Sequence, residues 1–297
     1  MLNIVDIKQA ALAVGFDDCG VARADALTDE EYPLREWLRR GWHGDLGYME
    51  RNVDMRMDPR LLVPGAKSVI CCVSAYPPPE DILPAFGGNP GDHGNRFDKI
   101  SQDIDGPDKS WRSQKNLQDF QDFACYGVGL ADKREKVAAY ARTREYHKVV
   151  KDMLFALREK LGIDGKVCCD TVPISDKHWA ARAGLGWIGR HTLLVTPQWG
   201  TWVNLGEIVT TEEVSEYSEQ SEYSDFCTKC GRCVAACPNG AIAPEGPSML
   251  NVARCTAYYN THRQRAIPPD VDTRGYTLGC DLCQLACPFN RKNILPD

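Results

Sequence analysis

The stretch CTKCGRCVAACP, residues 227–238, places four cysteines at the spacing Cys-x₂-Cys-x₂-Cys-x₃-Cys and ends in proline. A second stretch, CDLCQLACP at residues 280–288, repeats the last three cysteines and the proline of this pattern. The position of its missing first cysteine holds Thr277, and the lone Cys255 lies between the two stretches and can supply a fourth thiolate. The two stretches and Cys255 together offer two complete shells of four sulfurs.

This spacing is typical of bacterial ferredoxins, in which the fourth cysteine of such a run ligates the other of two clusters. The sequence therefore predicts two [4Fe–4S] clusters and a protein that transfers electrons. The predicted ligands of one cluster are Cys227, Cys230, Cys233 and Cys287, and those of the other are Cys237, Cys255, Cys280 and Cys283. Structural zinc is disfavoured because its sites use two CxxC pairs for four ligands, and a disulfide framework because it suits short secreted chains.

Composition restricts the class of protein. The chain has 297 residues, of which 43% are hydrophobic, so it can form one large domain and a small one. No apolar run is long enough to span a bilayer, and the opening MLNIVDIKQAALAVGF resembles an amphipathic helix more than a signal peptide. Fourteen cysteines as free thiols favour the reducing cytoplasm. A net charge of −6 excludes a general basic field for nucleic acid.

Residues 1–215 are predicted to form a mixed α+β domain, and residues 216–297 a smaller cluster domain. Hydrophobic periodicity predicts helices at 4–14, 32–40, 135–140 and 144–161, and strands at 68–75, 166–170, 192–196 and 202–210. Residues 80–122 are rich in Gly, Pro, Asp and Asn and are predicted to be a surface insertion, either a lid or a mobile loop. The acidic, polar stretch 211–225 is predicted to be a linker.

The stretch GLGWIG, residues 184–189, satisfies the GxGxxG pattern of dinucleotide sites. That fingerprint requires a strand before it and a helix after it, whereas here SDKHWAARA predicts a helix before it and HTLLVTP a strand after it. We therefore expect the glycines to make tight turns or to let the backbone approach a flat group. Four further cysteines lie in apolar runs and are predicted to be core residues: Cys71, Cys72, Cys168 and Cys169.

Asp170 and His147 are open to two interpretations each. Asp170 ends the strand-like run KVCCD, where an apolar pocket would raise the pKa of its carboxyl and keep a proton available for donation. Its position alone favours a turn or helix-capping aspartate ahead of Pro173. His147, near the start of a predicted helix, is by itself better explained as a packed surface residue than as a ligand.

Several stretches together resemble the epoxyqueuosine reductases, a family of corrinoid iron–sulfur enzymes. They are HGDLGYMERNVDMRMDPRLLVPGAKSVICC (43–72), AAYARTREYHK (138–148), CCDTVPISDKHWAARAGLGWIGRHTLLVTPQWGTWVNLGEIVTT (168–211) and the cysteine stretches with RCTAYY. The resemblance covers most of the chain apart from the insertion and the linker.

The resemblance implies a nitroreductase-like cobalamin-binding domain followed by a ferredoxin-like domain with two [4Fe–4S] clusters. It implies that electrons pass through the clusters to cobalamin, which reduces epoxyqueuosine in tRNA to queuosine. Asp170 stands at the motif position of the proton donor, which reverses the preference for a turn aspartate. The cofactor contacts that the resemblance implies are Arg56, Tyr140, His147, Asp176, Lys177, Gly186, Gly189 and Asp281. It also implies a tRNA substrate and an external electron donor such as flavodoxin or ferredoxin.

The chain departs from the family pattern in places that concern the substrate. The family's Glu-Arg pair is here Asp176-Lys177, and the segment 255–262 differs. Many members continue past the last cluster cysteine with helical repeats that help to hold tRNA, whereas this chain ends at Asp297. Two alternatives therefore stay open: a corrinoid reductase of a small molecule, for example a reductive dehalogenase, and a non-catalytic electron carrier.

Overall fold

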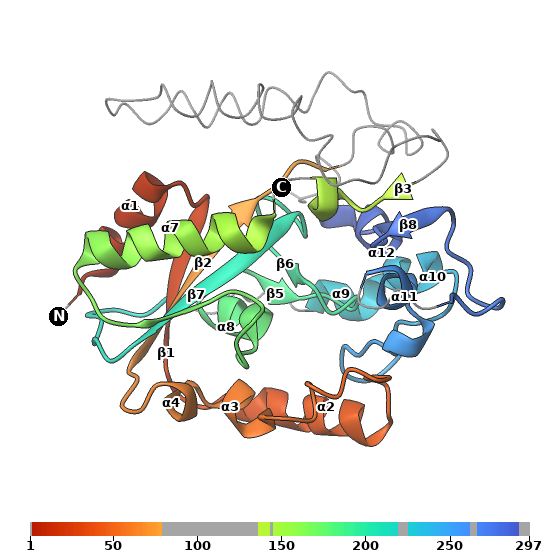
Figure 1. Cartoon of the computed structure of the whole chain (residues 1–297), viewed down its shortest axis with the longest axis horizontal. Helices are drawn as coiled ribbons and strands as arrows, with labels where there is room; N and C mark the ends of the chain where they lie inside the picture. Colours follow the sequence, from red (N-terminus) through yellow and green to blue (C-terminus); the bar gives the residue numbers. More distant parts are fainter. Residues whose placement is uncertain (1, 79–135, 143–144, 219–224, 262–265, 291–297) are drawn as a thin grey trace.

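The computed structural model describes residues 2–78, 136–142, 145–218, 225–261 and 266–290. The predicted insertion at 80–122 lies outside these ranges. Within them, a central sheet is flanked by helices, and a group of short helices holding the C-terminal cysteines packs beside it (Figure 1). No helix in the described ranges is at once long and apolar enough to cross a lipid bilayer.

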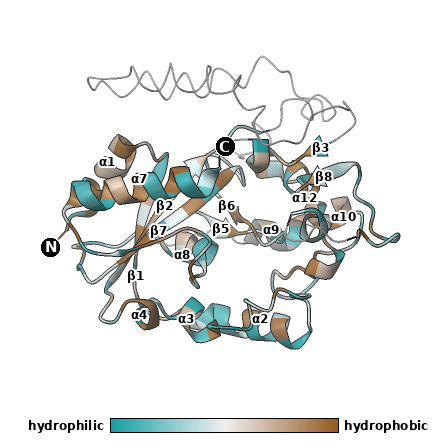
Figure 2. Cartoon of the chain, in the orientation of Figure 1, coloured by the Kyte–Doolittle hydropathy of each residue, from teal (hydrophilic) through white to brown (hydrophobic). Residues whose placement is uncertain are grey.

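The central sheet has four strands in the order β1-β2-β7-β4, and every neighbouring pair is antiparallel. Its strands are β1 (Asp18–Arg23), β2 (Ser68–Ala75), β7 (Val203–Thr210) and β4 (Lys166–Cys168). The first six residues of β2 are buried, because this apolar strand lies between β1 and β7 with both faces covered. Figure 2 shows hydrophobic residues along these strands.

Each face of the sheet has its own helical cover. Helices α1 (Ile4–Val14) and α7 (Tyr146–Leu161) pack on one face against Ile70, Cys72 and Ile208. Helix α8 (Asp176–Arg182) packs on the other face, where Cys71, Cys168 and Val209 lie. Successive residues of a strand point to opposite faces, so the alternation of Cys71 and Cys72 divides the core into two parts. The four cysteines predicted to be core residues are all fully buried.

The remaining elements surround the sheet and form the cysteine-rich part. Helices α2 (Thr28–Arg39), α3 (Val53–Met57) and α4 (Pro59–Leu62) follow one another along one side of the molecule (Figure 1). The hairpin of β5 (Trp187–Ile188) and β6 (Leu194–Val195) follows α8. The cysteine-rich part contains α9 (Asp225–Cys230), α10 (Arg232–Ala236), η4 (Val252–Arg254), α11 (Thr256–Asn260), β8 (Tyr276–Leu278), α12 (Leu282–Leu285) and η5 (Pro288–Asn290).

Several predicted elements are confirmed and two are wrong. The helix at 4–14 and the strand at 68–75 have the predicted bounds. The helix predicted at 135–140 is wrong: its described residues lie in the short strand β3 (Lys136–Val137) and at the start of the 3₁₀ turn η3 (Ala139–Arg142), because β3 pairs with β8 of the cysteine-rich part. Residues 211–218, predicted as linker, are held to the sheet domain, since Val214 is buried and the Ser218 hydroxyl accepts from the Val21 N–H at 2.9 Å.

Helix α8 approaches β1 so closely that Gly20 cannot carry a side chain without movement. A Cβ at Gly20 would lie 2.0 Å from the backbone oxygen of Ala183, just after α8. Gly20→Ala is therefore expected to lower the free energy of unfolding by about 1–3 kcal/mol, since the backbone has to shift. Denaturant unfolding measures this change. Gly47→Ala, where a Cβ meets nothing within 4 Å, is the matched control, and equal stability of the two variants would contradict the prediction.

Candidate functional site: two cysteine groups and a pocket at Asp170

The eight C-terminal cysteines lie on short elements that bring distant parts of the chain together. Cys227 and Cys230 are in α9, and Cys233 is in α10. Cys237 follows α10, and Cys255 precedes α11. Cys280, Cys283 and Cys287 lie in and around α12. All of them are free thiols, as are the other cysteines in the described ranges.

Electrostatic proximity divides these thiols into two groups. Burial raises the pKa of Cys287 to about 12, with further contributions from the charges of Cys227, Cys233 and Cys230. Burial likewise raises the pKa of Cys280 to about 12, with Cys255 and Cys237 among the neighbouring charges.

Cys283 joins the second group. Its pKa is raised well above the ordinary value by burial, and then by the charges of Cys255 and Cys280. The charge of Cys233, in the first group, also raises the pKa of Cys283, so the two groups lie next to each other. The assignment of four cysteines to each cluster, and the binding of clusters by these thiolates, stay predictions.

The chemistry of this donor set fits iron–sulfur clusters better than single metal ions. Among the described residues, no three His, Cys, Asp or Glu side chains converge tightly enough for one metal ion. A [4Fe–4S] cluster needs no such convergence, because each of its irons takes one thiolate and the sulfurs stand apart around the cube. Buried thiols with raised pKa values ionise when metal binds them.

Two hydrogen bonds reach the cysteine sulfurs from outside the helices. The indole Nε1 of Trp187, in β5, donates to Cys227 Sγ at 3.3 Å, and the Ala241 N–H donates to Cys237 Sγ at 3.3 Å. The Trp187 ring also meets Phe289 edge-on, with ring centroids 4.8 Å apart. The GLGWIG hairpin therefore contacts the first cysteine group directly.

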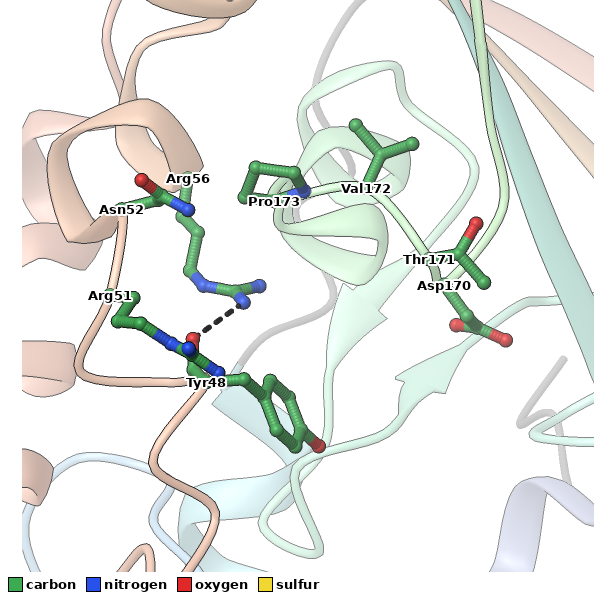
Figure 3. Close-up of a pocket in the computed structure, with 8 residues that line it drawn as sticks. All are labelled: Tyr48, Arg51, Asn52, Arg56, Asp170, Thr171, Val172 and Pro173. Atoms are coloured by element: carbon green, nitrogen blue, oxygen red, sulfur yellow. Dashed lines mark hydrogen bonds between the residues drawn. The ribbon is translucent and has the colours of Figure 1, made fainter.

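A pocket lies between the segment before and within α3 and the loop after β4. Its volume is ≈ 380 Å³, and it is lined by Tyr48, Arg51, Asn52, Arg56, Asp170, Thr171, Val172 and Pro173 (Figure 3). This volume is near the lower end for ligand pockets. The pocket therefore suits a group the size of a nucleobase or one edge of a larger ligand.

Arg56 brings an unused hydrogen-bond donor to this pocket. One terminal nitrogen of its guanidinium donates to the Tyr48 carbonyl at 3.2 Å. Its Nε is buried and has no partner among the residues that the structure describes. Burial lowers the pKa of Arg56 from its ordinary 12.5, and the guanidinium stays charged near neutral pH. An orphaned donor on a buried cation favours a polar or anionic group of a ligand here.

Asp170 enters the pocket from a strained loop. Its φ of 53° lies in the left-handed region, which few residues other than glycine adopt. The Tyr146 hydroxyl donates to Asp170 Oδ2, and His147 Nε2 lies 3.2 Å from the same oxygen. The Asp170 side chain is 45% exposed, so the expected apolar environment is wrong: polar groups of α7 hold this carboxyl in place.

Two further carboxyls lie behind the loop, fully buried Glu207 and partly buried Asp176. Neither carboxyl oxygen of Glu207, in β7, has a partner among the described residues while both carboxyls are ionised. Burial is the main cause that raises the pKa of Glu207, and the charge of nearby Asp176 adds to it. Burial also raises the pKa of Asp176, whereas the hydrogen bond with Glu207 lowers it by a smaller amount. A proton shared between the two carboxyls removes the cost of two bare charges. Asp176 Oδ1 also accepts from the Asp170 N–H at 3.4 Å.

Three other residues that the resemblance implies as cofactor contacts are each held by neighbouring protein groups. Lys177 donates to the Thr192 carbonyl, and burial lowers its pKa to about 8. Tyr140 meets Tyr146 edge-on with centroids 6.3 Å apart, which places it near Asp170. Asp281 is fully buried and accepts from the Ala139 N–H at 2.8 Å.

The two glycines of the GxGxxG stretch pack against their own hairpin. A Cβ at Gly186 would lie 2.1 Å from the Val195 oxygen, and one at Gly189 would lie 2.5 Å from the His191 ring. These close approaches explain both glycines without a ligand. Their role as cofactor contacts stays a prediction, as do the roles of Lys177, Tyr140 and Asp281.

Four residues of the site lie within the stretches that carry the family resemblance but were not singled out as site residues. Tyr48, Arg51 and Asn52 line the pocket from a segment without strong periodicity. Tyr146 anchors Asp170 from the first position of α7. Glu207 did offer a signal, because a charged residue within an otherwise apolar strand is unusual unless it is paired.

Trp187→Phe is expected to make the reduction potential of the adjoining cluster more negative. The lost indole N–H stabilises the reduced, more negatively charged cluster by about 1 kcal/mol, which is about 40 mV for one electron. Redox titration followed by electron paramagnetic resonance measures the shift at unchanged iron content. Trp199→Phe, in the core beside α8, is the control. An unaltered potential in Trp187→Phe would exclude this tuning role.

Glu207→Gln is expected to flatten the dependence of stability on pH. The raised pKa means that folded Glu207 keeps a proton that the unfolded chain releases above 4.5. The stability that protonated Glu207 contributes is therefore fully present below pH 4.5. It is lost as the pH rises toward the folded pKa of Glu207, by up to about 1.4 kcal/mol per pH unit. Denaturant unfolding between about pH 5 and pH 7 measures the slope. Exposed Glu159→Gln should keep the wild-type slope; equal slopes in both variants would contradict the shared proton.

Comparison with known proteins identifies the family. A family model described as a 4Fe-4S double cluster binding domain matches residues 226–290. An epoxyqueuosine reductase of Cyclobacterium marinum is 32% identical over 292 residues, which cover 96% of this chain and 78% of the relative. The structure of epoxyqueuosine reductase from Streptococcus thermophilus matches with a TM-score of 0.70 at 25% identity, covering 98% of this chain and 67% of that one.

Two further structures share this fold. Epoxyqueuosine reductase with a tyrosine tRNA stem loop modified by epoxyqueuosine matches with a TM-score of 0.68 at 25% identity, over 96% of this chain and 64% of that one. A reductive dehalogenase, whose structure suggests a mechanism for B12-dependent dehalogenation, matches with a TM-score of 0.51 over 97% of this chain and 32% of that one. At 14% identity this last likeness shows the fold alone. The family predicted from the sequence is confirmed: the chain belongs to the epoxyqueuosine reductases.

Proposed function

We propose that this protein is a cobalamin-dependent iron–sulfur reductase that converts epoxyqueuosine in tRNA to queuosine. The observation that carries the proposal is a carboxyl, Asp170, held at the edge of a pocket beside a double cluster domain, in a chain of this family. In the pocket, Asp170 can donate a proton and Arg56 offers an Nε–H without a partner among the described residues. The cysteine groups supply a route for electrons.

The two parts of the chain divide this work. Residues 1–215 form the nitroreductase-like, cobalamin-binding catalytic domain of the proposal, and residues 216–297 form the ferredoxin-like domain with two [4Fe–4S] clusters. The antiparallel sheet with helices on both faces supports the first assignment. The grouping of the eight thiols supports the second.

The residues near the pocket suit an amide-rimmed macrocycle at its edge. Arg56 offers the orphaned Nε, and Tyr140 lies beside Tyr146 and Asp170. When bound, cobalamin supplies the low-valent cobalt that reduces the substrate, and the clusters supply the electrons. The proposed contacts are Arg56, Tyr140, His147, Asp176, Lys177, Gly186, Gly189 and Asp281.

The work of Asp170 is to donate a proton to the oxygen that leaves the substrate. Its Oδ2 is occupied by Tyr146 and His147, and no residue in the described ranges bonds to Oδ1. Oδ1 is therefore the atom that can face a substrate in the pocket. A departing alkoxide is a strong base, so a positioned acid accelerates its loss by about 10²–10⁴-fold.

The partners of the proposal are tRNA and an external electron donor of the flavodoxin or ferredoxin type, in the cytoplasm. The relative solved with a modified tRNA stem loop supports the first partner. Arg51 and Arg56 line the pocket and can contact a phosphate or a base edge. The electron donor and the location stay predictions.

A second candidate function is the reduction of a small molecule, such as reductive dehalogenation. The fold shared with a reductive dehalogenase supports it, and so does the modest volume of the pocket. It keeps Asp170 as the acid and changes only what the pocket holds. An electron carrier without its own substrate has no use for an acid at a pocket, so we do not retain it.

The test is turnover of tRNA that contains epoxyqueuosine. Anaerobically reconstituted protein with cobalamin and a reductant is expected to form queuosine, measured by mass spectrometry of the digested nucleosides. Asp170→Asn is expected to lower the rate by about 10²–10⁴-fold, because the amide has no acidic proton to give.

Two measurements make this test decisive. The absorption spectrum of bound cobalamin and the iron content show that Asp170→Asn still holds its cofactors. Glu159→Gln on the exposed side of α7 should turn over like the wild type. If the epoxyqueuosine in tRNA stays unreduced and a halogenated phenol is turned over, the second candidate function replaces the proposal.

A further inference from the structure

The proposed reaction needs more protons than Asp170 carries. Reduction of an epoxide to an alkene breaks two C–O bonds, forms one C=C bond and releases the oxygen as water. This takes up two electrons, which the proposed function draws from the clusters, and two protons. A single carboxyl holds one proton, so Asp170 has to be reprotonated for each turnover.

His147 stands between Asp170 and a second carboxylate. Its Nε2 lies 3.2 Å from Asp170 Oδ2, and its Nδ1 lies 2.5 Å from Glu145 Oε1. Only the imidazolium form carries protons on both ring nitrogens and donates to both carboxylates at once. The arrangement therefore favours a ring that holds one transferable proton directed at Asp170.

We propose that Glu145, His147 and Asp170 form a proton-supply path, in which His147 reprotonates Asp170 during the reduction of the substrate. His147 Nε2 releases its proton to Asp170 Oδ2, and the neutral ring regains a proton from water with Glu145 as its partner on Nδ1. Asp170 then carries a proton again and donates it to the oxygen that leaves the substrate. This inference rests on the proposed function for the number of protons, and on the geometry for the route.

The path begins at Asp170 and continues through residues that do not line the pocket. His147 and Glu145 are not among the residues that line the pocket, and their side chains are 36% and 46% exposed. A substrate and a macrocycle would cover the pocket side of Asp170 and exclude water from Oδ1. His147 would still reach solvent, so protons can enter while the pocket is closed to water.

Tyr146 is the neighbouring group that does not serve as the source. Burial and the charge of Asp170 raise the pKa of Tyr146 far above its ordinary value, so the phenol keeps its proton and anchors Oδ2. The ring of Tyr146 stacks on that of His147 at 4.0 Å, which fixes the imidazole plane. Imidazoles, in contrast, take up and release protons near neutral pH.

The other ionisable groups near the path leave its direction unchanged. Lys151 donates to the Thr171 hydroxyl at 2.9 Å, one residue beyond Asp170. Lys148 is exposed, and only its backbone N–H bonds to Glu145. The carboxyl pair of Asp176 and Glu207 meets Asp170 through the backbone N–H, which is not a route to its carboxyl.

The decisive variant is His147→Phe, which keeps an aromatic ring against Tyr146 and removes the proton. In single turnovers with pre-reduced holoenzyme at low buffer concentration, its rate is expected to fall roughly 10–100-fold. Added imidazole is expected to restore the rate in a saturable manner, with a solvent deuterium isotope effect. The KM for the substrate should stay that of the wild type, and cobalamin content is measured alongside the rate, because His147 is also a proposed cofactor contact. Lys148→Gln is the matched control on the same turn of α7.

A second readout, on the same holoenzyme, needs neither substrate nor turnover. Nitrogen-15 NMR of histidine-labelled protein shows whether both nitrogens of His147 carry protons, with His147→Phe assigning the signal. The ring placed between Glu145 and Asp170 is expected to carry protons on both nitrogens in the wild type and to lose one in Glu145→Gln.

Either of two results would overturn the path: a neutral His147 in the wild type, or a rate loss in His147→Phe that imidazole leaves unrepaired. If the wild type fails to reduce epoxyqueuosine, the proposed function fails, and the NMR result decides the proton path independently.

Discussion

The partial or complete burial of seven of the eight C-terminal thiols is the constraint on which the rest of the structure depends. Burial raises the pKa of Cys280 and Cys287 to about 12, so neither thiol would ionise near neutral pH by itself. Bound iron reverses this, because the metal replaces the lost hydration of the thiolate. Apolar packing in this part of the chain is modest, with buried residues such as Val252 and Tyr258. Helices of four to six residues do not form alone. The clusters therefore act as the core of this part.

The cysteine-rich part is joined to the sheet domain by polar contacts at several points. Asp281, fully buried between Cys280 and Leu282, accepts from the Ala139 N–H, and Gln284 accepts from the Thr201 hydroxyl at 2.9 Å. Trp187 donates to Cys227 Sγ. Each of these bonds links a cysteine element to a segment outside the cysteine-rich part. The placement of η3 and of the β5–β6 hairpin therefore depends on contacts with the cysteine elements.

Sequence patterns predicted the elements whose bounds depend on local sequence, and they missed the contacts that depend on the tertiary structure. The apolar run of β2 and the helical period of α1 gave the observed bounds, because burial alone defines them. Residues 136–140 were misassigned, since their short strand exists only through its pairing with β8, about 140 residues away. The ligand spacing of the cysteines was visible because chemistry fixes it. The partners of Asp170 and the pairing of Glu207 with Asp176 were not, because they join β7, α7 and α8 in space.

The two interpretations of Asp170, a turn residue and an acid, describe one residue under two constraints. The loop turns at a φ of 53°, and aspartate adopts this region more readily than most residues because its short carboxyl bonds locally. The same short side chain places Oδ2 against Tyr146 and His147, in a residue that lines the pocket. A glutamate would have the acid without the turn, and an asparagine the turn without the acid. Backbone strain of this kind persists where surrounding bonds enforce it, and here α7 and Asp176 supply those bonds. The turn is therefore part of what aims the proton.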